Sequence, residues 1–245
     1  MPKALSKSKS KPVTLSQRHI VAMGGAIGPA ASRLVDYSLK LSGKKKPKVL
    51  LVTTATGDRA DDVLFFTNVL ANLECSVLHL PFFSRTPPDL RSLVLAHDVV
   101  LVGGGNTKSM LAVWREFGFD TIIRAAWESG IVLCGSSAGG ICWFEDCITD
   151  SFAGSFAALP ALGILKGSCC PHYNGEPGRP EAYHAHMLAG RVGSGIAIDE
   201  CVGVHYIGDE ITEVVSGKKD GAAYKVTIRR GKVREEKLVA RLLIR

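Results

Sequence analysis

A serine set among small residues, directly after a short apolar run, is the first candidate for chemistry in this chain. Residues 131–134 have the length and apolar content of a buried strand, and Gly135-Ser136-Ser137-Ala138-Gly139 follows at once. This pentapeptide fits the G-x-S-x-G pattern, in which a strand turns sharply into a helix and leaves the central serine exposed. Ser137 is therefore the candidate nucleophile. The backbone N–H of Ala138, at the start of the following helix, would stabilise negative charge developing on a substrate oxygen.

Two other interpretations of the pentapeptide stay open. The free N–H groups of a Gly/Ser turn before a helix suit any anion, so the turn could bind a phosphate group. It could also be a plain strand–helix connection. A phosphate-binding protein would use Gly24-Gly25 and Gly103-Gly105, although the first loop, Gly24-Gly25-Ala26-Ile27-Gly28, does not fit the G-x-G-x-x-G fingerprint.

A glycine triplet favours the nucleophile. Gly103-Gly104-Gly105 follows the apolar run 98–102, and Ser137 follows the next strand along the chain. Because ligands bind at the carboxyl ends of parallel strands, the two segments are expected to meet at one edge of a sheet. Gly104 and Gly105 would then present backbone N–H groups, beside that of Ala138, as an oxyanion hole.

The elements that must position these residues alternate between strand and helix. This alternation predicts an α/β fold with a mostly parallel sheet flanked by helices. Its strands are expected at 19–23, 48–54, 76–80, 98–102 and 131–134, and its helices at 31–41, 61–73, 89–96, 108–116 and 121–128. Beyond residue 144 the pattern is less regular. A strand is expected at 167–170, a helix at 179–190, and an antiparallel finish to the sheet at 195–199, 202–207, 212–215 and 223–228.

Composition limits the classes of function. The chain has 245 residues, is 46% hydrophobic and carries a net charge of +7, of which the acid-free segment 1–18 supplies +5. We therefore expect a disordered basic tail over 1–18, a single α/β domain over 19–245, and no nucleic-acid partner. No apolar run is long enough for a membrane span, so no membrane partner is expected. Seven cysteines without a C-x-x-C pair indicate free thiols in the cytoplasm, and neither a metal nor a cofactor is expected.

Five ordered motifs together carry a family resemblance. They are Gly103-Gly104-Gly105-Asn106-Thr107, the Gly-Ser-Ser-Ala-Gly pentapeptide, Cys142-Trp143-Phe144-Glu145, Thr149-Asp150-Ser151 and Cys170-Pro171-His172-Tyr173. With these motifs the chain resembles the S51 serine peptidases, the group of dipeptidase E and cyanophycinase, from about residue 19 to the C-terminal strands. The resemblance implies a fold similar to the class I glutamine amidotransferase domains.

The resemblance also assigns roles to residues. It implies that Ser137 is the nucleophile, that His172 is the general base, and that Gly104 or Gly105 with Ala138 form the oxyanion hole. Asp150 lies where the family places an important aspartate and is the expected third member. A later glutamate is the family's alternative for that role, and Asp209 and Glu210 lie near its region. Taken alone, His172 could be a structural histidine, and His184, His186 and His205 are rivals for its role.

The expected substrate is a small peptide. The family's dipeptidases favour an N-terminal aspartate, and an arginine after the histidine reads its carboxylate. Arg179 matches that arginine at a shorter spacing, and Asn106 is the other candidate substrate-binding residue, although it could simply cap a helix. A cyanophycinase-like peptidase and a non-catalytic binding protein of the same fold are the alternatives. An exposed sheet edge would allow a homodimer.

Overall fold

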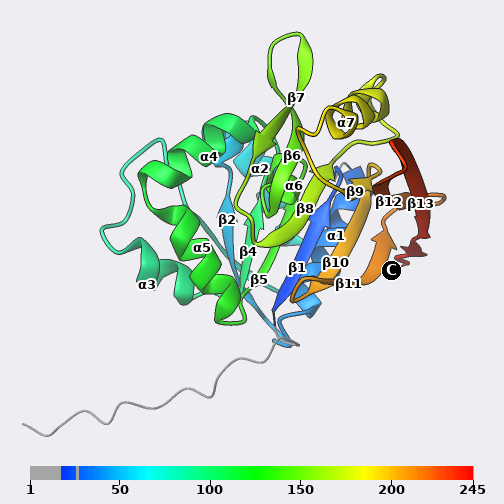
Figure 1. The fold of residues 1–245 in the computed structure, drawn as a ribbon. Coiled ribbons are helices and arrows are strands. Elements are labelled where there is room, and N and C mark those ends of the chain that lie inside the picture. The colour runs from blue at the N-terminus through cyan, green and yellow to red at the C-terminus, as the bar shows by residue number, and fades with distance from the viewer. Residues whose placement is uncertain (1–17, 26–27, 245) are drawn as a thin grey trace, which may run out of the picture.

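The structure, a computed structural model, describes residues 18–25 and 28–244. The expected tail over 1–18 lies outside the described residues except for Arg18, and Ala26 and Ile27 of the first glycine-rich loop lie outside them too. The described chain is a mixed α/β structure with two sheets, helices and antiparallel C-terminal strands (Figure 1). This confirms the predicted fold class. None of its described helices is long and apolar enough to cross a bilayer.

The larger sheet has eight strands in the order β14-β11-β10-β1-β5-β4-β2-β3. Five of them, β1 to β5, are mutually parallel. β10 is antiparallel to both of its neighbours, β1 and β11, and β14 runs parallel to β11. The strands are β1 (His19–Met23), β2 (Lys48–Val52), β3 (Ser76–His79), β4 (Val99–Val102), β5 (Val132–Ser136), β10 (Val202–Ile207), β11 (Glu210–Ser216) and β14 (Arg241–Leu242). The inner strands are continuous apolar runs because both of their faces are buried.

Helices cover both faces of this sheet. They are α1 (Gly28–Lys40), α2 (Ala60–Ala71), α3 (Leu90–Leu95), α4 (Thr107–Glu116), α5 (Phe119–Glu128) and the single turn α6 (Ala138–Ile141). Alternate strand residues point to opposite faces, so Val49 and Leu51 pack with α1 and α2, whereas Leu50 and Val52 pack with α4 and α5. The sheet is thus a rigid central layer whose strand ends are fixed from both sides.

A second sheet of six strands corrects one expectation. Its order is β13-β12-β9-β8-β6-β7. Its strands are β6 (Phe144–Phe152), β7 (Ser155–Pro160), β8 (Leu165–Cys170), β9 (Gly195–Ile198), β12 (Ala222–Arg229) and β13 (Lys232–Val239), and α7 (Arg179–Leu188) lies beside it. The predicted antiparallel finish to one sheet is right for β10 and β11, but β9 and β12 belong to the second sheet. The sequence pattern did not predict β6, because this strand contains several polar residues and is irregular, with a register shift between Thr149 and Phe152.

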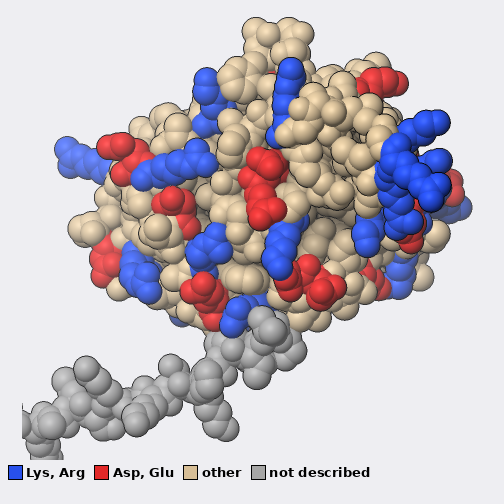
Figure 2. Space-filling view, viewed as in Figure 1, with Lys and Arg blue, Asp and Glu red and all other residues tan. Residues whose placement is uncertain are grey.

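Charged side chains of both signs are mixed over the face shown in Figure 2, and basic ones gather where β12 and β13 lie. Four basic residues in and beside the turn between these strands, Arg229, Arg230, Lys232 and Arg234, line a surface hollow. The absence of a nucleic-acid partner stays a prediction.

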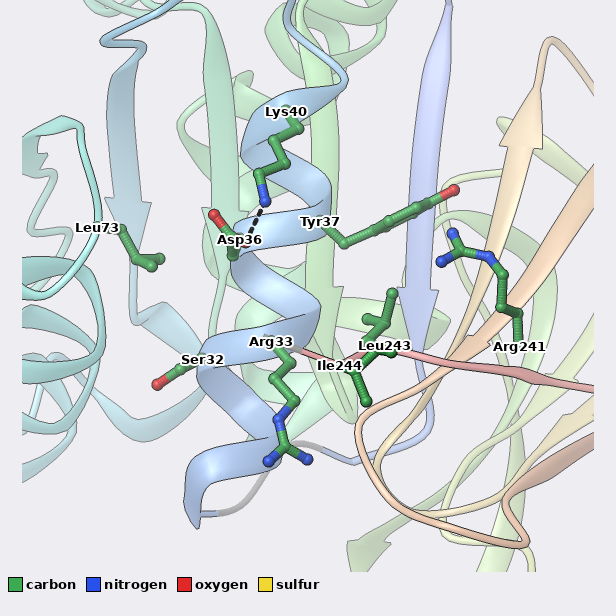
Figure 3. A pocket seen from close by; sticks show the side chains of 9 residues that line it. All are labelled: Ser32, Arg33, Asp36, Tyr37, Lys40, Leu73, Arg241, Leu243 and Ile244. Atoms are coloured by element: carbon green, nitrogen blue, oxygen red, sulfur yellow. Dashed lines mark hydrogen bonds and ion pairs between the residues drawn. The ribbon is translucent and has the colours of Figure 1, made fainter.

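A partly buried polar network, centred on buried His205, joins the N-terminal strand to the C-terminal one. His19 Nδ1 lies 3.0 Å from His205 Nε2, and the Tyr37 hydroxyl lies 2.8 Å from His205 Nδ1. The same hydroxyl donates to Glu213, which also accepts from Arg241 of β14. Figure 3 shows Tyr37 reaching toward Arg241 across a cavity of about 270 Å³ between α1 and the C-terminal segment. The network therefore fixes β14 to the edge of the larger sheet.

This network makes stability depend on pH. Burial lowers the pKa of His205 to about 4, whereas an unfolded histidine titrates near 6.5. The unfolded chain therefore binds a proton between these values that the folded chain does not, and the free energy of unfolding falls as the pH is lowered from 6.5 to 4. In His205→Gln, we expect the decrease in the free energy of unfolding between pH 6.5 and pH 4 to be smaller than in the wild type by about 3 kcal/mol. Urea titrations across this range would measure it. His97→Gln, outside the network, is the control, and equal pH slopes for wild type and His205→Gln would contradict the prediction.

Candidate active site

The glycine triplet and the serine meet as expected. β4 pairs with β5 in parallel, with Val102 opposite Gly135. Gly103 and Ser137 therefore emerge at neighbouring carboxyl strand ends. β1 lies on the other side of β5, with Met23 opposite Ser136, so Gly24 emerges there as well. The central strands thus bring three segments that are distant in sequence to one edge of the sheet.

Ser137 sits on a strained turn between β5 and α6. Its φ is +54° and its ψ is −117°, a conformation that non-glycine residues rarely adopt. Its N–H donates to Met23 O at 3.0 Å, which holds the turn against β1. The close approach of α6 requires Gly139, where a Cβ would lie 2.4 Å from Val102 O. Because α6 is only one turn long, the expected helix dipole contributes little here, and individual N–H groups matter more.

His172 faces Ser137 from the end of β8. Its Nε2 lies 2.8 Å from Ser137 Oγ. The loop that carries it is anchored by its own N–H, which donates to Gly24 O at 3.1 Å, and by Tyr173 N–H, which donates to Ile198 O. Gly25 makes room for the imidazole, because a Cβ there would lie 2.8 Å from the ring. The serine and the histidine are thus held within hydrogen-bond distance by backbone contacts to β1 and β9.

Glu200, which the sequence pattern does not predict as a site residue, contacts the other ring nitrogen of His172. Its Oε1 lies 3.2 Å from His172 Nδ1. Glu200 follows β9, and its N–H donates to the Asn174 side chain. Asp199, immediately before it, is buried, and burial raises the pKa of that carboxyl. The signal available in the sequence was the acidic pair Asp199-Glu200 at the end of the predicted strand 195–199.

The expected third member, Asp150, is not beside the histidine. Its side chain is 63% exposed, and its Oδ2 lies 3.9 Å from Arg179 Nη2. Asp209 and Glu210 are also misplaced for this role. Both residues come after Ile207, the last residue of β10. Ile207 pairs with His19 at the amino end of β1, whereas Ser137 and His172 lie at the carboxyl end of that strand. The structure therefore places Asp150 beside Arg179 and not beside His172, and Glu200 takes the position next to the imidazole.

Backbone donors lie next to the serine. A Cβ on Gly104 would lie 3.1 Å from Ser137 Cβ and 3.7 Å from Ser137 Oγ, so Gly104 packs directly against the serine. Gly105, with φ +132°, packs instead on the carbonyl of Ala55. Within residues 18–25 and 28–244, the N–H groups of Gly104, Gly105 and Ala138 have no hydrogen-bond acceptor. Unpaired donors beside a serine can bind an oxyanion.

Comparison with known proteins decides the family. The model of peptidase family S51 matches residues 20–214. The chain belongs to peptidase family S51. It is 39% identical over 229 residues to the "Uncharacterized peptidase YgaJ" of Bacillus subtilis (strain 168), covering 92% of this chain and 99% of that protein. The chain is therefore a peptidase, and hence a hydrolase.

Solved structures support the fold of this S51 peptidase. A peptidase from an acI-B1 Actinobacterium superposes with a TM-score of 0.69 at 19% identity, covering 91% of this chain and 94% of that one. A putative peptidase E protein from Listeria monocytogenes EGD-e gives a TM-score of 0.62 at 17% identity, covering 81% and 98% of the two chains. At these identities the likeness concerns the fold alone.

The two expected substrate-binding residues of this S51 peptidase are engaged within the protein. Asn106 caps α4, with its Oδ1 accepting from Ser109 N–H at 2.8 Å, and its Nδ2 donates to Ser151 O at 3.3 Å. Arg179 is buried, and Glu176 binds its guanidinium. Asn106 thus supports the loop after the glycine triplet.

The three rival histidines contact other groups. His184 contacts Glu235, His186 contacts Phe156 O, and His205 belongs to the partly buried network with Tyr37. All seven cysteines are free thiols. Burial raises the pKa of Cys134 to about 12, which leaves that thiol unreactive. In the part of the chain that the structure describes, no three His, Cys, Asp or Glu side chains form a cluster suited to a metal ion.

Proposed function

We propose that this chain is a serine-type peptidase that hydrolyses short peptides through an acyl-enzyme on Ser137. One observation carries the proposal, the continuous contact from Ser137 Oγ to His172 Nε2 (2.8 Å) and from His172 Nδ1 to Glu200 Oε1 (3.2 Å). A serine hydroxyl needs an adjacent base to act as a nucleophile, and a base needs a third group to orient it. The restriction to short peptides, including dipeptides, is part of the proposal and follows from the family resemblance.

The geometry supports a two-step reaction. His172 Nε2 takes the proton of Ser137 Oγ as that oxygen attacks the scissile carbonyl carbon, and the N–H groups of Gly104 and Ala138 bind the resulting oxyanion. The C–N bond then breaks, and the proton on His172 passes to the leaving amine. In the second step His172 takes a proton from water as the water oxygen attacks the acyl carbon. The bond from that carbon to Ser137 Oγ then breaks, the carboxylic acid product leaves, and the proton on His172 returns to Ser137 Oγ. Glu200 holds the imidazole with its Nδ1–H toward the carboxylate throughout.

The contact between the serine and the histidine argues against a non-catalytic binding protein. Such a protein needs no hydrogen bond between these side chains and no strained serine. Here both are present, with Ser137 at φ +54°. Strain at a single non-glycine residue persists only where the surrounding structure enforces it, and it is concentrated at active sites. No observation favours a cyanophycinase-like substrate over other short peptides.

A serine-directed fluorophosphonate tests the proposal. We expect the native protein to be labelled on the proteolytic fragment that contains Ser137, and to hydrolyse members of a panel of dipeptides and tripeptides. His172→Ala is expected to lose both activities because the base is gone. Heat-denatured protein is the control for non-specific labelling. Peptide hydrolysis without a label on Ser137, or no hydrolysis of any peptide by folded protein, would refute the proposal.

A further inference from the structure

Arg179 is a buried cation whose charge is already compensated. Its side chain is 1% exposed. Nε donates to Glu176 Oε2 at 2.7 Å, Nη2 donates to the same oxygen, and Nη1 donates to Ile148 O at 3.4 Å. The guanidinium also lies over the Phe156 ring, 4.4 Å from its centroid. Burying an unpaired charge costs several kcal/mol, so Glu176 is what allows Arg179 to be buried.

This ion pair lies beside the proposed catalytic groups. Glu176 N–H donates to His172 O at 3.2 Å, one turn after the histidine. A Cβ on the intervening Gly175 would lie 2.7 Å from the carboxyl carbon of Glu200. The 172–176 turn therefore connects the ion pair directly to the histidine and to the glutamate that orients it.

On its other side, the ion pair is connected to the segment that follows the glycine triplet Gly103-Gly105. Asp150 Oδ2 lies 3.9 Å from Arg179 Nη2. The next residue, Ser151, accepts a hydrogen bond from Asn106 through its carbonyl, and its hydroxyl accepts from Lys108 N–H. Arg179 thus links the base side of the site to its oxyanion side. A substrate residue next to the scissile bond must lie between these two sides.

We propose that Glu176 is a specificity-determining residue that excludes an aspartyl side chain from this position, so that the substrates are short peptides with an uncharged N-terminal residue. The inference rests on the proposed function. A substrate carboxylate would have to displace Glu176 from a charge-assisted hydrogen bond, or join two carboxylates at one guanidinium. Glu176 and Asp150 are both partly exposed, so they repel an incoming anion. Lys108, whose ammonium lies 4.5 Å from the Phe152 ring centroid, is the nearby cation that could oppose this repulsion.

The test compares kcat/KM for Asp-Leu and Leu-Leu. In the wild type we expect Asp-Leu to be at least about tenfold poorer than Leu-Leu, and Glu176→Gln to raise the ratio of Asp-Leu to Leu-Leu about tenfold, a factor worth about 1.4 kcal/mol. Glu176→Gln keeps the size of the side chain and removes its charge, and Glu176→Ala also opens the path to Arg179. Glu181→Gln removes an exposed carboxylate from the same region, on α7, and is expected to leave the ratio unchanged.

The outcomes separate this inference from the function on which it rests. A wild-type preference for Asp-Leu overturns it, and so does an unchanged ratio in both folded Glu176 variants. The ratio of kcat/KM for Asp-Leu to that for Leu-Leu in the wild type tests the inference even if Glu176→Ala fails to fold. If the wild type hydrolyses no peptide at all, the proposed function fails and this inference fails with it.

Discussion

Ser137→Ala is expected to lower kcat/KM for the best peptide substrate by about 10⁴-fold or more, with the fold intact. The hydroxyl is the only part removed, and it is the atom that forms the acyl-enzyme. Alanine has the same backbone preferences as serine at φ +54°, so the strained turn gains no new penalty. Residual activity would come from the unpaired N–H groups of Gly104 and Ala138, which still bind the oxyanion. Initial rates on a dipeptide panel, with thermal denaturation of the same samples, would measure the effect.

The neighbouring serine provides the matched control. Ser136 is the last residue of β5 and is buried, whereas Ser137 is partly exposed and contacts His172. We expect Ser136→Ala to retain activity within about tenfold, because the substitution removes no group that touches the proposed reacting atoms. If both variants lost activity equally, or if Ser137→Ala kept most of it, the nucleophile would be another residue.

The parallel part of the larger sheet could be predicted because each of its strands is a short apolar run that can be recognised from its own residues. Runs such as 49–52 and 99–102 are apolar on both faces, as buried parallel strands require. Each ends in small residues where a loop approaches the backbone. From this pattern alone Gly103–105 and Ser137 could be placed at one edge, and β4 and β5 are indeed neighbours.

The third member of the proposed catalytic triad could not be predicted in this way. Which carboxylate reaches His172 depends on which strand lies beside β8, and the pairing of β8 with β9 is a property of the second sheet. The sequence pattern does not reveal that sheet, because β6 is irregular and because the sheet joins β6, β7 and β8 to strands from later segments, 195–198 and 222–239. Asp150 lies on β6, whereas Glu200 follows β9, the strand that pairs in parallel with β8. Arg179 shows the same limit, since its partner Glu176 lies on the preceding turn and only the structure shows that they pair.

The second large effect is expected for Glu200→Gln, which should lower kcat by about 10² to 10⁴-fold while changing KM only a few fold. The amide keeps the size of the side chain, but it offers the imidazole an N–H donor or a neutral oxygen in place of a carboxylate. The neutral imidazole is then no longer held with its proton on Nδ1, and the imidazolium formed during attack loses its compensating charge. Because the substrate does not contact this carboxylate, binding should be affected much less than turnover.

Asp150→Asn is the matched comparison for Glu200→Gln. It also replaces a carboxylate by an amide of the same size, at the residue that the sequence predicts to orient His172. That carboxylate lies 3.9 Å from Arg179 Nη2, so neutralising it should lower kcat on Leu-Leu far less than Glu200→Gln does. Steady-state kinetics of the three proteins, with circular dichroism to show that each is folded, would measure both effects. If the asparagine variant were the slower one, His172 would be oriented by Asp150 in the working enzyme, and the contact between Glu200 and Nδ1 would have no catalytic role.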